Sequence, residues 1–432
     1  MKTYWNKDIT PNTFPKLNKD ISTNILIIGG GLCGLLCAYK LEEKNINYIL
    51  VEAGNIGSKS SACNTGKISA QHGLIYHRLI ESIGVEKAKL YLDANLEAVK
   101  EYRHICKGLD VDFENQSAYC YSLNNRELLE KELNALKILN YNAELVDNLP
   151  LPFKNEGAIC FKNQACFNPA KFCNQIAKDL SIYEHTKIVT INNNEAITED
   201  GYKIQAKKII VTTHFPFIDS LGLFFMKMYQ ERTYGIFISN VKRFEGMYID
   251  ENKDGLSLRF DKDNLLIYGG DTRVGCSDTY YKQARTFAKF HYPNSKEVST
   301  IANEDCITLD EIPYIGEYSN INKNLLVATG FNKWGITHSL IAANVLCDII
   351  LKKENPLIDL YKPSRMIVPS SFVSHLFEST KNMLRPTTKR CTHLGCGLVY
   401  NNAENSWDCP CHGSRFNEKG EILDGPATKE LK

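Results

Sequence analysis

The segment NILIIGGGLCGLLCAYKLEEKNINYILVE, residues 24–52, joins an apolar run, a glycine loop, an amphipathic stretch and a second apolar run. The first run is rich in isoleucine, which favours a strand, and apolar residues then recur at helical spacing to about residue 44. The second run would be a strand that ends at Glu52. The order of strand, loop, helix and strand predicts a compact βαβ unit.

Three glycines of the loop match the G-x-G-x-x-G pattern, and each has a mechanical role. Gly29 would allow the tight turn, Gly31 would let a pyrophosphate approach the backbone, and Gly34 would let helix and strand pack closely. The helix N-terminus would offer free N–H groups to the phosphates, and Glu52 is placed to accept hydrogen bonds from the ribose hydroxyls. A glycine triplet alone also suits an ordinary tight turn. Its register with strand, helix and acidic residue predicts a site for FAD or NAD.

The composition indicates a folded chain with a small ligand. Its 432 residues suffice for two or three domains of roughly 100–200 residues. The formal charge of +1 gives no electrostatic reason to expect nucleic acid. The chain has no uncharged apolar stretch of about 18 residues, and 11 of the 15 cysteines are scattered, as in reduced intracellular proteins. We expect a cytoplasmic protein without a transmembrane segment; peripheral contact with a membrane stays open.

The remaining chain alternates between two architectures. Residues 76–139 predict a helical layer, whereas alternating runs between residues 224 and 270 predict an antiparallel sheet. Strand and helix patterns at residues 170–214 and 324–352 suit a return to the nucleotide-binding sheet. The predicted division is a discontinuous nucleotide-binding domain (20–75, 160–222 and 301–356), a substrate and helical domain (76–159 and 223–300), a linker (357–386) and a C-terminal domain (387–432).

Separate pieces of residues 24–365 resemble FAD-dependent oxidoreductases of the D-amino acid oxidase and glycine oxidase type. SSACNTGKISAQHG (60–73) resembles the segment beside the flavin, YEHTKIVTI (183–191) the strand that meets the adenine, and IIVTTHFP (209–216) the strand that closes the FAD site. VATGFNKWGITHS (327–339) resembles the loop and helix start that stabilise the charge of reduced flavin, although alone it also suits an ordinary turn. The resemblance implies FAD and adds these cofactor residues to the glycine loop and Glu52: Ser61, Thr65, Gly66, Val189, Gly330, Gly335 and Thr337.

The C-terminal stretch CTHLGCGLVYNNAENSWDCPCHGSRF, residues 391–416, holds four cysteines and two histidines. Cys391 and His393 form a C-x-H pair, and Cys409 and His412 form a C-x-x-H pair. Two thiolates and two imidazoles are the ligand set of a Rieske [2Fe-2S] centre. Zinc accepts the same four ligands, but usually with C-x-x-C spacing and paired histidines, so this arrangement suits zinc poorly.

CTHLGC and CPCHGS closely resemble the Rieske proteins of respiratory and photosynthetic cytochrome b complexes. The resemblance implies a disulfide between Cys396 and Cys411, with two free thiols as the alternative, and a hydrogen bond from Ser414 to a cluster sulfur. High-potential members carry tyrosine where this chain has Phe416, so we expect a potential in the lower part of the range of about −150 to +300 mV. The short run before the first ligand, including SFVSHLFESTKNMLRP (371–386), reads as a helix and predicts a shortened Rieske domain.

Together, these pieces resemble a bacterial family of FAD-dependent oxidoreductases with a C-terminal Rieske domain. The predicted fold is α/β and α+β: a Rossmann-like FAD-binding domain with an inserted antiparallel-sheet substrate domain and a small Rieske domain. An amine or amino acid would give hydride to the flavin, which would pass single electrons to the cluster and on to a redox protein or quinone. An amino-acid oxidase needs an arginine fork and an aromatic hydroxyl, for which the candidates are Arg232, Arg273 and Tyr234.

Lys67 is the candidate cation beside the flavin, where it would favour the anionic reduced form. A structural role is the alternative for Lys67, the two arginines and Tyr234, and it is our expectation for His72 and His77. Two other functions stay open for the whole chain. One is an electron-transfer protein that serves a partner redox protein, and the other is a flavoprotein with a vestigial cluster site.

Overall fold

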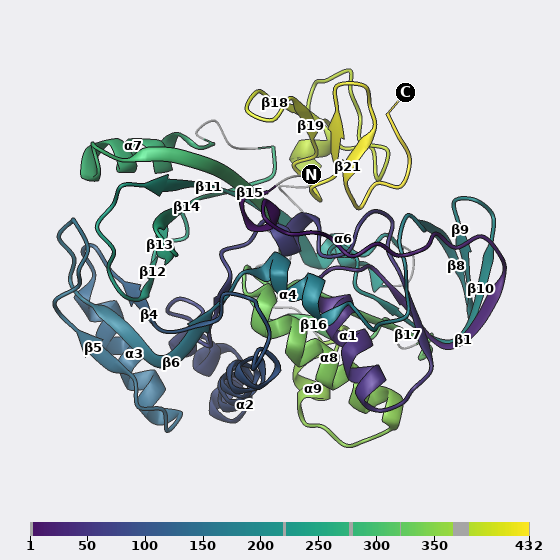
Figure 1. Cartoon of the computed structure of the whole chain (residues 1–432), viewed down its shortest axis with the longest axis horizontal. Coiled ribbons are helices and arrows are strands. Elements are labelled where there is room, and N and C mark those ends of the chain that lie inside the picture. Colours follow the sequence, from purple (N-terminus) through teal and green to yellow (C-terminus); the bar gives the residue numbers. More distant parts are fainter. Residues whose placement is uncertain (1–2, 219–221, 276–279, 320, 366–379, 432) are drawn as a thin grey trace.

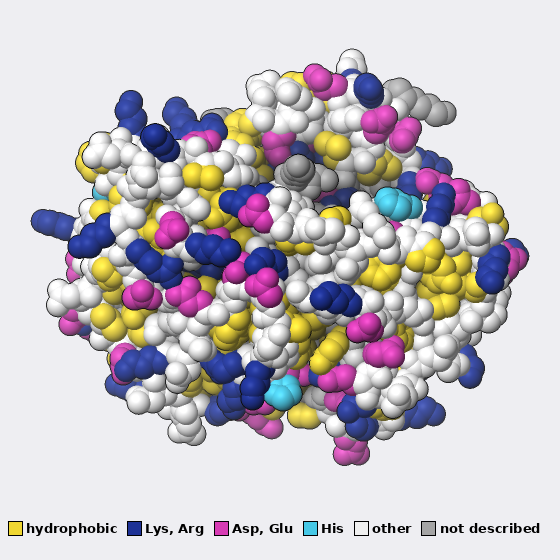
Figure 2. Space-filling model, viewed as in Figure 1, with side chains coloured by type: hydrophobic (Ala, Val, Ile, Leu, Met, Phe, Trp, Pro, Cys, Tyr) yellow, Lys and Arg dark blue, Asp and Glu magenta, His cyan; other side chains and the backbone are white. Residues whose placement is uncertain are grey.

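The computed structural model describes residues 3–218, 222–275, 280–319, 321–365 and 380–431. Their strands form three sheets of eight, nine and four strands, and the C-terminal sheet lies in a small lobe above the rest (Figure 1). This architecture confirms the predicted α/β and α+β fold. Basic and acidic side chains are interspersed over the face shown in Figure 2. Within the described ranges, no helix is long and apolar enough to cross a bilayer.

The eight-stranded sheet contains the predicted βαβ unit. β1 pairs in parallel with β2 and β10, and β10 pairs in parallel with β17. The predicted strand at residues 183–191 is wrong in detail, because two short strands occur there with a turn between them. The strands are β1 (Ile21–Ile28), β2 (Tyr48–Val51), β7 (Ile182–Tyr183), β8 (Ile188–Asn192), β9 (Glu195–Thr198), β10 (Lys203–Val211), β16 (Tyr314–Glu317) and β17 (Leu325–Thr329).

The nine-stranded sheet contains the predicted antiparallel strands and extends beyond them. The prediction of helix throughout residues 76–139 is wrong at Glu114–Tyr121, which form β4 because they pair with β6 and, in parallel, with the distant β12. The predicted domain boundary at residues 300–301 falls inside β15. The strands are β3 (Lys67–Ile68), β4, β5 (Glu144–Val146), β6 (Ala158–Cys166), β11 (Met228–Ser239), β12 (Met247–Asp250), β13 (Leu256–Asp261), β14 (Asn264–Arg273) and β15 (Lys296–Thr308).

The C-terminal lobe is an antiparallel sheet of β18 (Val399–Asn401), β19 (Ser406–Asp408), β20 (Arg415–Asn417) and β21 (Ile422–Asp424). The helix predicted at residues 371–386 lies mostly outside the described residues, and residues 380–383 of it are helical. The described helices are η1 (Tyr4–Asn6), α1 (Leu32–Glu43), η2 (Lys59–Ala62), α2 (Tyr76–Ile105), α3 (Arg126–Ile138), α4 (Pro169–Ile176), α6 (Phe224–Lys227), α7 (Lys282–His291), α8 (Gly335–Leu351) and α9 (Leu357–Tyr361).

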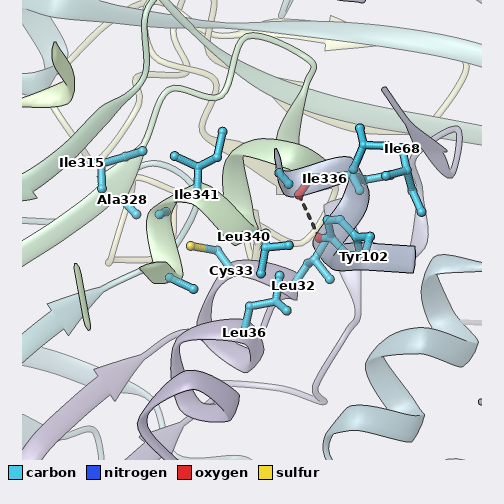
Figure 3. Close-up of a cluster of buried hydrophobic side chains, with 14 of the residues drawn as sticks. Leu32, Cys33, Leu36, Ile68, Tyr102, Ile315, Ala328, Ile336, Leu340 and Ile341 are labelled. Carbon is cyan, nitrogen blue, oxygen red and sulfur yellow. Dashed lines mark hydrogen bonds between the residues drawn. The ribbon is translucent and has the colours of Figure 1, made fainter. Parts of the chain in front are cut away.

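Helices α1 and α8 share one buried apolar core, in which Leu36 of α1 lies close to Leu340 of α8 (Figure 3). Tyr102 of α2 closes this core and donates a hydrogen bond of 2.8 Å to the carbonyl of Ile336. Each helix follows a parallel strand, α1 after β1 and α8 after β17. The two helix N-termini therefore lie at the same edge of the sheet, where parallel α/β folds bind their ligands.

Candidate functional site

A cavity of about 360 Å³ lies at this sheet edge, between the ends of β1, β10 and β17. Many residues predicted to bind the cofactor form its wall: Gly29, Gly31, Glu52, Ser61, Thr65, Gly330, Gly335 and Thr337. Lys67, the predicted cation, also lies in the wall. Gly34, Gly66 and Val189 are outside it, although Lys187 and Ile188, beside Val189, line the cavity.

The glycine loop has the close contacts that its sequence pattern requires. Gly29 has a φ of +108°, and a Cβ on Gly34 would lie 1.9 Å from the carbonyl oxygen of Gly29. A Cβ on Gly31 would meet only the Ser61 hydroxyl, at 3.2 Å, so the loop backbone is open toward the cavity. Glu52 accepts 2.7 Å hydrogen bonds from the N–H groups of Gly30 and Gly54, which holds the carboxylate at the cavity wall.

The second glycine loop brings the start of α8 to the cavity. Gly330 has a φ of +70°, and a Cβ there would lie 2.3 Å from a methyl carbon of Thr308. The Thr337 hydroxyl lies 3.3 Å from Nε2 of His72, whose ring also contacts the Tyr91 hydroxyl at 2.7 Å and the Ser69 carbonyl at 2.9 Å. Burial lowers the pKa of His72 well below its usual value. His72 is therefore a neutral residue behind the cavity wall.

Two buried side-chain oxygens in the wall make no hydrogen bond within the described residues, namely Oε1 of Gln230 and Oδ1 of Asn303. Buried polar atoms are nearly always paired in native proteins, so these oxygens suit a ligand with hydrogen-bond donors. With the glycine cradle, Glu52 and the N-termini of α1 and α8, the wall fits an FAD molecule.

Lys67 is buried in the wall next to the nine-stranded sheet. Its Nζ donates hydrogen bonds to the Tyr248 carbonyl, at 2.8 Å, and to the Ser257 hydroxyl. Burial, together with the nearby Arg259 guanidinium, lowers the pKa of Lys67 to about 7. At neutral pH this amine can therefore both accept and release a proton. His77 lies elsewhere and pairs with Glu132 at 2.6 Å.

The predicted metal ligands lie on two loops with the same backbone pattern. The Cys391 N–H donates to the Cys396 carbonyl at 2.8 Å, and the Cys409 N–H donates to the Ser414 carbonyl at 2.8 Å. In each loop the N–H of the glycine four residues after the cysteine donates back to the cysteine carbonyl at 2.9 Å. A disulfide joins Cys396 and Cys411 across the two loops.

The ligand side chains come together in this lobe as a cysteine pair and a histidine pair. The rings of His393 and His412 lie 5.1 Å apart, and the Nδ1 atoms of both rings are buried and make no hydrogen bond to the part of the chain that the structure describes, although both residues have other contacts. A hydrogen bond from Cys409 lowers the pKa of the Cys391 thiol to about 6. Two adjacent thiols and two inward imidazole nitrogens fit the donor set of a [2Fe-2S] cluster of the Rieske type.

Arg232, Tyr234 and Arg273 lie outside the cavity wall, against the C-terminal lobe. Nε of Arg232 donates to Glu404 at 2.6 Å, and the Tyr234 hydroxyl lies 3.4 Å from the same carboxylate. Nε of Arg273 donates to the Pro410 carbonyl at 2.8 Å, between two ligand residues. The structure thus brings the three candidates together at a domain interface.

Buried charges connect this interface to the cavity. Arg232 lies 3.2 Å from Glu304, which lines the cavity, and Arg415 of the lobe lies 3.4 Å from the same carboxylate. Burial raises the pKa of Glu304 to about 8, with a further contribution from Asp424. Glu304 is therefore mostly protonated at neutral pH, which lowers the negative charge in the interface.

Sequence reasoning missed several residues of the cavity wall. Phe215 and Glu304 fall inside segments that the family resemblance covers, but no local pattern distinguishes them from neighbouring residues. Gln230 had no signal in the sequence. The third group comes from the C-terminal lobe: Ile422, Asp424, Gly425, Pro426, Ala427 and Thr428. This segment is far from the glycine loop in the sequence, and the fold brings it into the wall of the same cavity.

Two family models match the sequence. The model of the FAD dependent oxidoreductase family, DAO, matches residues 24–349, and the Rieske [2Fe-2S] domain model matches residues 368–432. The first match covers the glycine loop, Glu52 and the start of α8. The second contains all four predicted ligands and both disulfide cysteines.

Individual proteins match the chain in whole or in part. YhfW of Bacillus subtilis (strain 168) is named as a Rieske 2Fe-2S iron-sulfur protein. It is 31% identical over an alignment of 493 residues, gaps included, which spans 100% of this chain and 97% of that protein. The chloroplast cytochrome b6-f iron-sulfur subunit of Pisum sativum is 54% identical over 41 residues, which cover 10% of this chain and 18% of that subunit. The structure of glycine oxidase from Geobacillus kaustophilus superposes with a TM-score of 0.67 at 15% identity, over 80% of this chain and 100% of that chain, which shows a common fold.

Proposed function

Because the chain belongs to the FAD-dependent oxidoreductase family and carries a Rieske [2Fe-2S] domain, we propose that it oxidises a small amine or amino acid and passes the electrons from the flavin to the cluster. Its cofactors are FAD and a [2Fe-2S] cluster. One observation carries the proposal: residues of the C-terminal lobe, among them Asp424 and Ala427, form part of the same cavity wall as the glycine loop. The two redox sites are thus adjacent within one chain.

The chemistry removes two electrons and two protons from the substrate. The substrate ammonium group loses a proton and the neighbouring C–H bond breaks with loss of hydride, which leaves an iminium ion that water converts to a carbonyl compound and ammonium. FAD supplies the two-electron acceptor, and the cluster supplies a one-electron carrier toward a redox protein or quinone. Oxidation of one substrate therefore reduces two equivalents of a one-electron acceptor.

The described residues supply the binding and proton-transfer groups for this reaction. The N–H groups at the start of α1 would bind the pyrophosphate of FAD, and Glu52, in the cavity wall, would bind the ribose. We assign the proton of the substrate ammonium group to Lys67, because this residue lines the cavity and its amine has a pKa of about 7. Thr337 lines the cavity at the start of α8, where this helix N-terminus would stabilise the pyrimidine end of the flavin.

The geometry supports a docking role for Arg232 and Arg273 in place of a substrate fork. Both guanidinium groups bond to the C-terminal lobe, and no arginine is among the residues that line the cavity in the described structure. A substrate carboxylate would therefore meet lysines, of which Lys59, Lys67, Lys187 and Lys333 line the cavity. This arrangement favours amine substrates whose binding does not depend on recognition of a carboxylate by arginine.

The test is an anaerobic titration of the purified protein with a panel of primary and secondary amines and amino acids. We expect one compound to bleach the flavin absorbance and to produce the EPR signal of the reduced cluster without dithionite. The matched control is Cys409→Ser, in which the flavin should bleach and no Rieske signal should appear. Absence of flavin bleaching with every compound would refute the substrate class.

Reduction of the cluster only by a protein donor would favour the second candidate, an electron-transfer protein. One observation supports it: His393 is only half-buried, so its side of the cluster is accessible to a protein partner. The same titration, repeated with a reduced ferredoxin in place of the amine, separates these two functions.

A further inference from the structure

The cluster ligand His412 faces the flavin domain. Its side chain is 1% exposed, and Nε2 donates a 3.1 Å hydrogen bond to the carbonyl of Phe225 on α6. Its ring meets Phe215 and Phe225 edge to face, with ring centroids 6.2 and 6.0 Å away. His393, in contrast, is half-buried. One side of the cluster site is therefore closed by the flavin domain.

Two residues reach both the His412 loop and the cavity. Phe215 is 3% exposed, lines the cavity and contacts the His412 ring. Gln230 is 1% exposed and lines the same cavity. Its amide nitrogen donates to the His412 carbonyl at 2.5 Å and to the Gly425 carbonyl at 3.2 Å. Both bonds end on the C-terminal lobe, so this one side chain attaches the ligand loop to the cavity wall.

The backbone of the ligand loop is shaped to receive Gln230. A Cβ on Gly413 would lie 2.4 Å from the Gln230 amide nitrogen, and Gly413 has a φ of +85°. A side chain at this position would therefore both strain the backbone and displace the amide. The fit places His412, Gly413 and Gln230 in direct van der Waals contact.

We infer that Phe215 and Gln230 form the junction through which electrons pass between the flavin and the His412 side of the cluster; this rests on the proposed function. Each transfer oxidises the flavin by one electron and reduces the cluster by one, and the flavin protons leave to solvent. A one-electron acceptor then takes the electron on the His393 side. Gln230 is a positioning residue, because it holds the loop that carries His412. Phe215 fills the space between the His412 ring and the cavity.

The experiment reduces the flavin by light in the anaerobic full-length protein, so it needs no substrate. Freeze-quenched samples then give the rate at which the cluster EPR signal grows. We expect Gln230→Leu and Phe215→Leu each to slow this rate by about tenfold or more, as is typical when a partner of a metal ligand is removed. Cluster content and the two reduction potentials should stay close to those of the wild type, and each rate is compared per protein molecule that holds both cofactors.

The control is Phe224→Leu, which changes a buried phenylalanine of the same α6 helix whose ring contacts Tyr314 and Tyr318 and not His412. It should transfer electrons at the wild-type rate. Gly413→Ala provides a second route to the same junction if a larger change prevents folding, and it should also slow the transfer. Wild-type rates in Gln230→Leu, Phe215→Leu and Gly413→Ala would overturn the inference about this junction and would leave the proposed function standing. Failure of the wild type to reduce its cluster would instead overturn the proposed electron transfer.

Discussion

Replacing Arg232 by methionine should release the C-terminal lobe from the flavin domain. Arg232 is 7% exposed and contacts Glu304 in the cavity wall and the Glu404 carboxylate in the lobe. Methionine keeps much of the side-chain volume but removes the charge and all its hydrogen bonds. The Glu404 carboxylate would then stay buried with only Arg415 to balance it.

The expected cost follows from the low exposure of the ion pair between Arg232 and Glu404, whose side chains are 8% and 17% exposed. Removing one member of a buried ion pair typically costs about 3–5 kcal/mol, because the other charge is left without compensation. The matched control is Arg78→Met, whose ion pair with Glu311 has side chains 45% and 33% exposed. An exposed pair of this kind contributes about 0–1 kcal/mol. The expected loss in the free energy of unfolding is therefore several-fold larger for Arg232→Met than for Arg78→Met.

The assay is urea unfolding of the full chain, followed by loss of the cluster absorbance as a signal for the lobe and by flavin release as a signal for the larger domain. We expect Arg232→Met to lower the urea midpoint of the cluster signal much more than it lowers the urea midpoint of the flavin signal. Adding Glu404→Gln should recover part of the loss, because the neutral amide removes the uncompensated charge. Equal midpoints for Arg232→Met and Arg78→Met would refute the assignment of Arg232 to lobe docking.

Three further predictions concern the cofactor sites and the interface. Gly34→Ala would place a Cβ 1.9 Å from the Gly29 carbonyl oxygen, so the purified protein should lose its flavin absorbance and keep the cluster EPR signal; retained flavin would contradict the close packing at this loop. Cys409→Ser should remove the cluster signal and leave flavin content unchanged, and equal loss of flavin would show that the sites are not independent. Burial raises the pKa of Glu304 to about 8, so its stabilising contribution is complete below about pH 4.5 and is lost as pH rises to 8. Glu304→Gln should therefore flatten the fall of the urea midpoint between pH 5 and 8, and an unchanged slope would contradict this ionisation.

The sequence predicted the sites that depend on short segments. The G-x-G-x-x-G loop and the two cysteine and histidine pairs each lie within a few residues, so their spacing, read with the flanking segments, indicates their chemistry. Membership of the FAD-dependent oxidoreductase family and the presence of a Rieske domain, both expected from these motifs, are confirmed.

Features that depend on distant pairing could not be predicted in this way. Strand β4 is stabilised by β12, which follows about 130 residues later, so local helical spacing was misleading there. Arg232 contacts Glu404 across 172 residues of sequence. A buried arginine beside a flavin domain suits either a substrate carboxylate or a neighbouring domain, and only the fold distinguishes the two. The assignment of Arg232 to docking therefore needed the three-dimensional contacts.

The contribution of the C-terminal lobe to the cavity wall has a consequence for maturation of the protein. Asp424 and Ala427 leave the ribosome long after Gly29, and they complete the wall of a site that begins at Gly29. The flavin site is therefore finished only when the lobe has folded and docked.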